Sequence, residues 1–501
     1  MTNLSDLFPA GAGKQVSFTA SGNVTSSGKP VVLNSDGTVS EVSGATFAVG
    51  SASSAYSDGN APADKQVICY DTSQDRVVVG YSPSATRNFY LVAGAVSGST
   101  ITWGSPVTVF SAIDSGGMFD ICFDSSNNCV VYTLEDASTV YVGCATLSGS
   151  TITDHSGTRA SVSQDVTRLY CVYDATNSKT LVYGREVTTN LGICWAISVS
   201  GTTPTFSSSY AWTGSTLFDV ANAVHDPDQQ RIVIVISGWG SSPGSVVLVD
   251  CSGATPTGTS FIQYQATDAY APAITYDTTN DKIVIGYYDN QNSGYISYIA
   301  GTVNAAGSTV TFGTKTTQTE QLTRYPSYPS MTFDTANNQI LNAYLNGDTT
   351  GVSNYGSYVQ NVTLSGTTVV LGEINTIYAG SGSATAYYFS ISVYDPDTTK
   401  LVFVYADQGD ASGSRGFGRV VTPGATNLTA SGFLGISDAA ISSAASGNIT
   451  IKGGIAATGL SSLTPASDYY VQDDGTITTV SSSVKAGKAL SATAINLEYT
   501  S

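Results

Sequence analysis

Short apolar runs alternate with polar turns along most of the chain, and one arrangement of them recurs. Residues 67–81, VICYDTSQDRVVVGY, hold an apolar run, an aromatic–Asp pair, a polar turn and a second apolar run. Two β-branched runs around a polar turn predict a β-hairpin. The pattern occurs seven times, as CYDTSQDRVVV, CFDSSNNCVVY, VYDATNSKTLVY, VHDPDQQRIVI, TYDTTNDKIVI, TFDTANNQILN and VYDPDTTKLVF.

The copies are regularly spaced, with 50 to 61 residues between successive Asp residues. A strand-only repeat of this length indicates a β-propeller. A third strand before a tight turn (92–100) and a fourth strand after it (101–110) complete the first unit. We therefore predict an all-β fold, with seven four-stranded blades over residues 44–423. The repeated Asp residues are Asp71, Asp124, Asp174, Asp226, Asp277, Asp334 and Asp395.

The two ends of the repeat array predict how the ring closes. VSGATFAVGSASSAY (42–56) matches VSGSTITWGSPVTVF (96–110), so it is a fourth strand without a blade of its own. The seventh hairpin is followed by a third strand near 416–422 and then by no further hairpin. We expect the N-terminal strand to complete the seventh blade, because closure removes exposed sheet edges.

The segments outside the propeller, 1–43 and 424–501, resemble each other. VVLNSDGTVSEVS (31–43) parallels YYVQDDGTITTVS (469–481). Both ends of the array are expected to leave the propeller on the face of the short turns. We therefore predict a small β-module that serves as a base for attachment. It is either one composite unit or two similar units side by side.

The opposite face carries the longer and more variable loops, and variable loops on a rigid scaffold are where binding usually occurs. These loops mix Tyr with Asn, Asp, Ser and Gly, a composition that suits sugar rings and is also ordinary for a solvated loop. The candidate ligand-binding residues are Tyr287, Tyr288, Asp289, Asn290, Asn292, Tyr295, Asn346, Asp348, Asn354 and Tyr355.

The charge balance narrows the choice of partners. The chain has 37 acidic and 19 basic residues, a formal charge of −18. Such a chain repels the phosphates of nucleic acids and anionic membranes. No stretch reaches the roughly 18 apolar residues of a membrane helix, and the start, MTNLSDLFPAGAGKQ, has no signal-peptide pattern. We expect a protein made in a cytoplasm that neither binds nucleic acid nor inserts into a membrane.

The residues that could carry chemistry are better explained by structure. An Asp that recurs seven times before a turn is typical of an Asx-turn rather than of an active site. His225 takes the place of the aromatic residue in its repeat, so we expect it to replace a core aromatic. His155 lies in the polar turn TDHSGT. Neither histidine supports a Ser–His–Asp site.

The remaining candidates give no cofactor, metal or catalytic residue. The carboxylate pairs Asp226/Asp228, Asp395/Asp397 and Asp473/Asp474 lie in turns and lack a calcium-loop spacing. The cysteines show no zinc spacing and are expected to be buried, reduced thiols. We therefore predict that the protein is not an enzyme. The cysteines are Cys69, Cys122, Cys129, Cys144, Cys171, Cys194 and Cys251.

The C-terminal segment 433–497 resembles a terminal module of tailed-bacteriophage appendage proteins. The resemblance rests on GLSSLTPASDYYVQDDGTI (459–477) and KAGKALSATAI (485–495). The family pattern has Leu-Thr-Pro-Gly-x-x-Tyr-Tyr-Val, and Ala466 stands here at the Gly. The propeller repeats that end in Ser-Gly-Ser-Thr also resemble those of predicted tail-fibre proteins of marine phages. The resemblance implies a structural role in a virion.

Three functions follow as hypotheses. The first is an oligomeric tail fibre or similar virion appendage, attached to other virion proteins of the tail or capsid, whose propeller face binds a host-surface glycan or protein. The second is a purely structural or decorating virion protein. The third is a polysaccharide-degrading enzyme, although the SxDxGxTW box of sialidase propellers is missing.

Overall fold

The computed structural model divides the chain into two compact units. One is formed by Phe47–Pro423, and the other by Met1–Thr46 together with Gly424–Ser501. The structure describes residues 14–498 except 45–46, 58–61, 84–85, 115–117, 213–217, 239–241, 293, 319–328, 348–354, 380–390, 408–414, 425, 430, 473–474 and 483.

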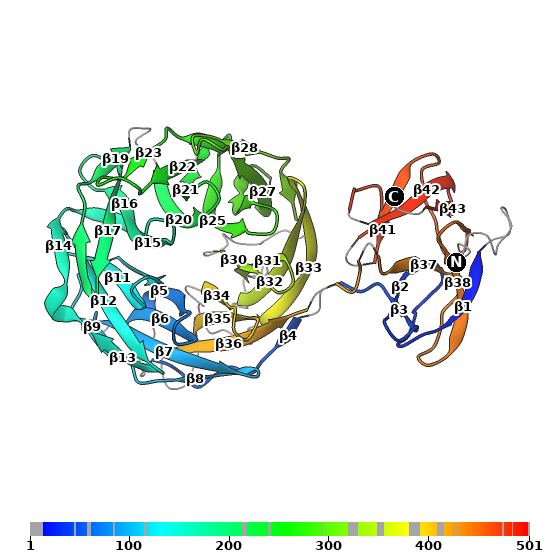
Figure 1. Ribbon diagram of the computed structural model, residues 1–501, viewed down its shortest axis with the longest axis horizontal. Helices are drawn as coiled ribbons and strands as arrows, with labels where there is room; N and C mark the ends of the chain where they lie inside the picture. Colours follow the sequence, from blue (N-terminus) through cyan, green and yellow to red (C-terminus); the bar gives the residue numbers. More distant parts are fainter. Residues whose placement is uncertain are drawn as a thin grey trace. The chain divides into compact units, whose positions relative to one another are not determined.

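The larger unit is a seven-bladed β-propeller, as the repeat predicted. Seven antiparallel sheets surround a central axis (Figure 1). The first three blades contain β5 (Pro62–Asp71), β6 (Arg76–Pro83), β7 (Phe89–Ser97), β8 (Thr100–Trp103) and β9 (Val107–Phe110); β10 (Phe119–Asp124), β11 (Cys129–Asp136), β12 (Thr139–Ser148), β13 (Thr151–Asp154) and β14 (Ala160–Ser163); and β15 (Val166–Asp174), β16 (Lys179–Glu186), β17 (Gly192–Ser200), β18 (Thr203–Phe206) and β19 (Tyr210–Trp212).

The other four blades follow the same order from the axis outward. They contain β20 (Phe218–Asp226), β21 (Arg231–Gly238), β22 (Gly244–Asp250), β23 (Thr257–Gly258) and β24 (Ile262–Gln265); β25 (Ala269–Asp277), β26 (Lys282–Asp289), β27 (Tyr295–Val303), β28 (Val310–Phe312) and β29 (Thr316–Thr317); β30 (Ser330–Asp334), β31 (Gln339–Gly347), β32 (Tyr355–Ser365) and β33 (Thr368–Ala379); and β34 (Ile391–Asp395), β35 (Lys400–Asp407), β36 (Arg415–Pro423) and β4 (Phe47–Val49).

The fourth strand is divided in blades 1 to 5. In the first blade β8 and β9 both pair with β7, so they are two pieces of one outer strand. In blade 6 the outer strand β33 is continuous over 12 residues. Short 3-10 turns lie at Ser156–Thr158, between the two outer pieces of blade 2, and at Asn290–Asn292.

The ring is closed by the N-terminal strand, as predicted. β4 pairs with β36 in the register Val49↔Val421 and Phe47↔Pro423. The backbone continues along the same edge, where Gly50 N donates to Val420 O at 2.8 Å. The seventh sheet is thus assembled from the two ends of the propeller segment.

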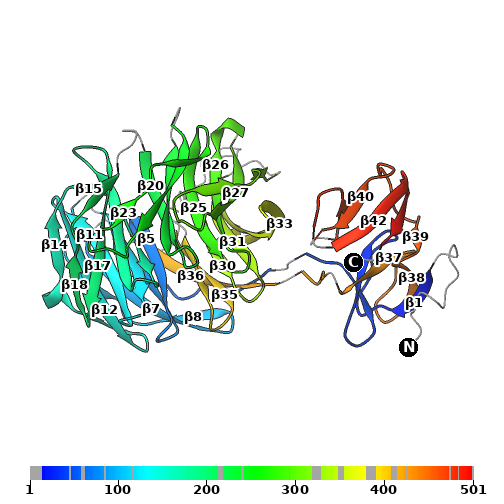
Figure 2. The ribbon, with the colours of Figure 1, turned by 45° about the horizontal axis from the view of Figure 1, so that its top comes forward.

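The propeller core consists of apolar clusters between neighbouring blades. One cluster joins Val78, Phe89 and Leu91 of blade 1 to Val130 and Leu134 of blade 2. These strands are buried on both faces, which explains their continuous apolar runs. Strands run between the two faces of the disc (Figure 2), so the β5–β6 and β7–β8 turns share one face and the β6–β7 loop lies on the other.

The smaller unit is one composite module of two sheets. The first sheet has the order β1-β38-β37-β2-β3 and mixes strands from both termini; the second has the order β39-β43-β42-β40-β41. Side chains of the two sheets share one core, which includes Val32, Phe433, Val471, Val484 and Leu497. The strands are β1 (Gln15–Thr19), β2 (Pro30–Leu33), β3 (Val39–Glu41), β37 (Phe433–Ser437), β38 (Ser446–Ile451), β39 (Ile455–Ala456), β40 (Asp468–Val471), β41 (Ile477–Thr478), β42 (Val484–Ser491) and β43 (Ala494–Leu497).

The two similar segments form equivalent hairpins within this module. In β2–β3, Asn34 N donates to Thr38 O at 2.8 Å; in β40–β41, Gln472 N donates to Thr476 O at 2.8 Å. The glycine of each turn, Gly37 and Gly475, has a positive φ, of 83° and 80°. The sequence parallel therefore reflects one hairpin design used once in each sheet.

Candidate functional site

The repeated Asp residues form the hairpin turns. Asp71 Oδ1 accepts the backbone N–H groups of Ser73 at 2.8 Å and Gln74 at 3.1 Å. The same pattern is found at Asp226, whose Oδ1 accepts from Asp228 N and Gln229 N. These contacts confirm the structural role predicted for this Asp, because one carboxylate oxygen fixes two backbone amides of the turn.

Side chains beside these turns join neighbouring blades. Tyr276 of blade 5 donates its hydroxyl to Asp228 Oδ2 in the turn of blade 4 at 2.6 Å. His225 of blade 4 makes the equivalent contact with blade 3, where its Nε2 lies 3.2 Å from Asp174 Oδ1 and 3.1 Å from Thr176 Oγ1. His225 thus replaces an aromatic residue, as predicted, but its ring serves as a polar link rather than as an apolar core group.

The same junction recurs where the ring closes. Burial and the neighbouring Asp395 carboxylate of blade 7 raise the pKa of Tyr70 in blade 1. Burial and Asp334 of blade 6 raise the pKa of Tyr394 in blade 7 to about 12. These phenols therefore remain protonated at neutral pH.

Basic residues after the turns make a second set of links. Arg76 of blade 1 donates Nε to Ser150 Oγ in blade 2 at 3.1 Å. Lys400 of blade 7 donates to the carbonyl of Gly98 in blade 1. On the short-turn face, these polar side chains therefore hold neighbouring blades together.

The predicted ligand-binding residues of the β26–β27 segment divide into buried and exposed groups. Tyr287 is fully buried, and its hydroxyl donates to Gln265 Oε1 at 3.2 Å. Tyr288 is also buried. Asp289 is fully buried and pairs with Lys315 Nζ at 2.7 Å. Because these three side chains are buried, they do not reach a ligand at the surface.

Two of the predicted residues do reach the surface. Asn290 is exposed, and Tyr295 is half-buried at the start of β27. The backbone of Asn292 ends the 3-10 turn Asn290–Asn292, that of Asn346 lies in β31, and that of Tyr355 begins β32. Asp348, Asn354, Asp473 and Asp474 lie outside the described residues.

Sequence reasoning missed Lys315, the partner of Asp289. Lys315 lies 26 residues further along the chain, between the two outer pieces of blade 5. Ser297 Oγ also donates to Asp289 Oδ2, at 3.1 Å. A lysine in a loop that follows an outer strand gives no sequence signal for this pairing, because only the blade brings the segments together.

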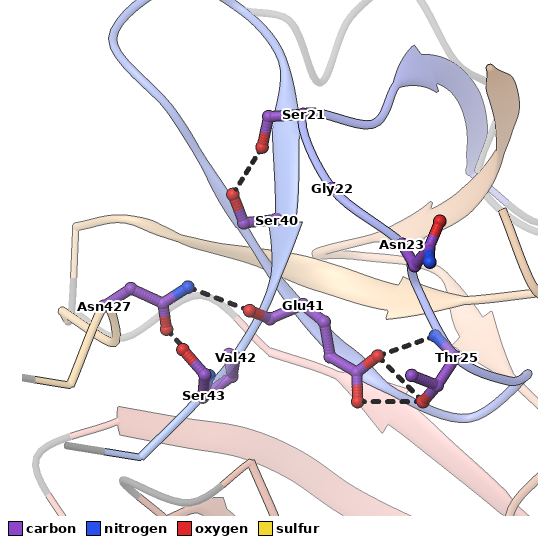
Figure 3. Close-up of a pocket in the computed structure, with 9 residues that line it drawn as sticks. All are labelled: Ser21, Gly22, Asn23, Thr25, Ser40, Glu41, Val42, Ser43 and Asn427. Carbon is purple, nitrogen blue, oxygen red and sulfur yellow. Dashed lines mark hydrogen bonds between the residues drawn. The ribbon is translucent and has the colours of Figure 1, made fainter. Parts of the chain in front are cut away.

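The smaller unit contains an open depression of about 460 Å³. It lies between the chain at Ser21–Thr25 and the edge strand β3 (Figure 3). Hydroxyl, amide and carboxylate groups dominate its lining, so it can accept polar groups. The lining residues are Ser21, Gly22, Asn23, Thr25, Ser40, Glu41, Val42, Ser43 and Asn427.

Glu41 is the charged group of this depression. Its Oε2 accepts Thr25 N at 2.7 Å, and its Oε1 pairs with Lys29 Nζ at 3.0 Å. Burial acts to raise the pKa of Glu41, but the hydrogen bonds from Thr25 and Lys29 outweigh it, and the pKa is lowered. Glu41 therefore binds the Lys29 ammonium group and the backbone amide of Thr25, both of its own chain.

Asn427 connects the two termini at the same depression. Its Oδ1 accepts Ser43 N at 2.9 Å and its Nδ2 donates to Glu41 O at 2.8 Å (Figure 3). The amide side chain thereby satisfies the carbonyl of Glu41, the last residue of β3, and the amide of Ser43 just beyond it, as a neighbouring strand would. This gives the lining a structural role.

Metal-ligating side chains and thiols are the remaining groups that could carry chemistry. Across the described part of the chain, no three His, Cys, Asp or Glu side chains are grouped to hold a metal ion. All seven cysteines are free and buried, as predicted. His155 Nε2 forms a hydrogen bond with Thr146 Oγ1 at 2.9 Å. In the same described residues, no helix is long and apolar enough to cross a membrane.

Comparison with known proteins identifies similar folds only. No protein-family model matches the chain, and no curated protein matches it. Similar solved structures include an ulvan lyase of polysaccharide lyase family PL25, with 9% identity, a TM-score of 0.46 and coverage of 80% of this chain and 95% of that one. The NanB sialidase of Streptococcus pneumoniae has 11% identity, a TM-score of 0.41 and coverage of 76% and 71%. A protein from Lactobacillus plantarum has 12% identity, a TM-score of 0.45 and coverage of 72% and 95%.

These structures correct one prediction. The sequence led us to predict that the protein is not an enzyme, and this prediction is corrected: similar solved structures include sialidases and a polysaccharide lyase, so the fold gives no ground for excluding catalysis. A propeller of this kind is compatible with catalysis. At these identities the likeness is one of fold alone.

Proposed function

We propose that the protein is an appendage of a tailed-bacteriophage virion, with the propeller as a host-binding head and the composite module as its attachment. The resemblance of residues 433–497 to phage appendage modules supports the virion role. The ligand proposed for the head is a glycan or protein of the host surface.

The single observation that supports a binding head on an attachment module is the pairing of Phe47 with Pro423. Both connections to the terminal module leave the propeller from this one pair. Pro423 ends the third strand of its blade, the position at which Ser97 of blade 1 enters a short turn. The loop face therefore carries neither of the two chain connections to the terminal module.

The contacts of the two faces support this division of roles. Side chains of the short-turn face bind neighbouring blades, as Arg76 and Lys400 do. Asn290 and Tyr295 on the loop face keep exposed surface. An amide beside an aromatic ring offers hydrogen bonds and apolar contact to a sugar or a peptide.

The test has two parts. Mass spectrometry of purified virions should detect this chain, and its absence would contradict the virion role. The full-length protein should compete with virions for adsorption to host cells. The double variant Asn290→Ala/Tyr295→Ala should compete at least tenfold less well, because each lost contact costs about 1 kcal/mol or more.

A matched control separates binding from folding. Thr151→Ala changes an exposed residue beside a short turn and should compete like the unchanged protein. Equal competition by all three proteins would favour the structural or decorating role. Release of new reducing ends from host polysaccharide would instead establish an enzyme.

A further inference from the structure

The seven buried thiols are unevenly distributed. Four of them, Cys122, Cys129, Cys144 and Cys171, share one apolar cluster between blades 2 and 3. Cys122 lies on β10 and Cys171 on β15, the innermost strands of the two blades. Each of these two is 8% exposed, whereas Cys129 and Cys144 are 0% exposed. The slightly exposed thiols are therefore the ones on the strands nearest the axis.

Cys122 and Cys171 lie in the same blade junction. Cys122 Sγ is 3.6 Å from Thr180 Oγ1 of β16, so this thiol faces blade 3. Cys171 pairs across the ladder with Val182, two residues from Thr180, so its side chain lies on that same face of blade 3. Asp120 Oδ2 accepts Cys171 N at 2.9 Å and ties β10 to β15 beside the two thiols.

The Cys122 thiol influences the protonation of Cys171. Burial and the neighbouring Cys122 thiol raise the pKa of Cys171. The Cys171 thiol is thus protonated at neutral pH, and Cys122, which is also a free cysteine, is its near neighbour.

We propose that Cys122 and Cys171 form a disulfide that joins blade 2 to blade 3 under oxidising conditions. The bond would close a loop of roughly 50 residues, which restricts the unfolded chain and so stabilises the folded one. This inference is independent of the proposed function, because it requires only an external disulfide as oxidant.

The exchange balances with a small disulfide R–S–S–R. One cysteine thiolate attacks a sulfur of R–S–S–R, forms a mixed disulfide and expels R–S⁻. The second cysteine thiolate then displaces the other R–S⁻ and forms the Cys122–Cys171 bond. The two cysteines lose two electrons and two protons, and two molecules of R–SH are produced.

Burial sets the rate and the selectivity of this reaction. The attacking species is the thiolate, so a raised pKa makes the exchange slow. Cys194 and Cys251 provide a comparison, because burial and Cys251 raise the pKa of Cys194 and both residues are 0% exposed. If access decides, this second pair stays reduced while the first is oxidised.

The experiment uses the full chain and bis(2-hydroxyethyl) disulfide, a probe small enough to enter a narrow opening. Non-reducing digestion and mass spectrometry should detect a peptide pair joined through Cys122 and Cys171. The thermal midpoint should rise by a few degrees and return to its original value with dithiothreitol. Cys122→Ala should lose both effects, and the control Cys194→Ala should keep both.

The peptide map of the unchanged protein decides the proposal even if a variant does not fold. Reduced Cys122 and Cys171 after prolonged exposure, separate mixed disulfides on each, or a bond from either to another cysteine would overturn it. Cys171→Ala offers a second variant with the same expectation as Cys122→Ala.

Discussion

His225 Nε2 lies 3.2 Å from Asp174 Oδ1, and this contact joins two successive blades of the propeller. Asp174 is fully buried and also accepts Asn177 N at 3.0 Å. His225, which replaces the aromatic residue of the other repeats, therefore still makes a polar contact with the neighbouring blade, as Tyr276 does.

Substitution of His225 tests this equivalence. His225→Ala leaves the Asp174 carboxylate without a cross-blade partner and should lower the free energy of unfolding by about 1–3 kcal/mol. His225→Tyr restores the residue of the other repeats and should recover most of that loss. Denaturant unfolding measures both, and Thr151→Ala, at an exposed residue, is a control expected within about 0.5 kcal/mol of the parent. An equal loss for alanine and tyrosine would contradict the shared role.

Acid should weaken the same junction through Asp174. Burial acts to raise the pKa of Asp174, but hydrogen bonds from His225 and Asn177 outweigh it, so the folded-state pKa is lowered. The stability that this group contributes is present above its unfolded pKa of about 3.9 and is lost as the pH falls through the folded pKa. Asp174→Asn should lower stability at pH 7 and reduce the loss between about pH 4 and pH 2, measured by thermal unfolding across pH.

Asp226 occupies the equivalent position of the next blade and is the control for this effect. Burial raises the pKa of Asp226, so its charged form costs stability at neutral pH. Asp226→Asn keeps an oxygen for the turn amides and should unfold at the same or a higher temperature at pH 7. A similar loss for both variants would show that the turn, not the His225 contact, sets the pH dependence.

Ring closure depends on the backbone of β4. Ala48 pairs with Thr422, and its side chain is exposed, so a substitution there acts mainly on the ladder. Ala48→Pro cannot fit a paired strand and should destabilise the propeller by about 3 kcal/mol or more. Limited proteolysis should then cut near the seventh blade, while Ala48→Ser should resist like the parent. Unchanged resistance of the proline variant would argue against closure by this strand.

Asn427 should hold the two termini of the module together. Asn427→Ala removes the bonds to Ser43 N and Glu41 O and should destabilise the module by about 1–3 kcal/mol. Asn448→Ala, an exposed change on β38, is the control within the same unit. Hydrogen exchange at β3 should rise in the first variant alone; equal exchange in both would contradict the bridging role.

The backbone at Ala466 favours glycine, the residue that stands here in the phage pattern that this segment resembles. Its φ is +65°, in the left-handed region that disfavours a Cβ atom. Ala466→Gly should raise the free energy of unfolding by about 1 kcal/mol. Ala492→Gly, at another exposed alanine, should lower it slightly, and both are measured by thermal unfolding. A loss at Ala466 would mean that the turn does not strain the alanine.

The sequence predicted more of the fold than of the binding site. Seven hairpins could be counted because each repeats an aromatic–Asp pair with the same turn, and the match of 42–56 to 96–110 indicated closure. The candidate site was chosen from loop composition, which does not encode burial. Tyr287 and Asp289 lie on the same face of β26 as the buried Ile283 and Ile285, so their side chains point into the interior. There Tyr287 contacts Gln265 and Asp289 pairs with Lys315.

Local repetition thus determined the propeller by itself, because strand period and turn chemistry are written within each copy of about 50 residues. The tertiary structure alone decided which polar groups pair with one another, within a blade or between blades. Asp174 meets His225, Asp289 meets Lys315, and Cys122 faces Thr180. These partners lie in different strands or blades, and only ring closure and blade packing bring them within contact distance.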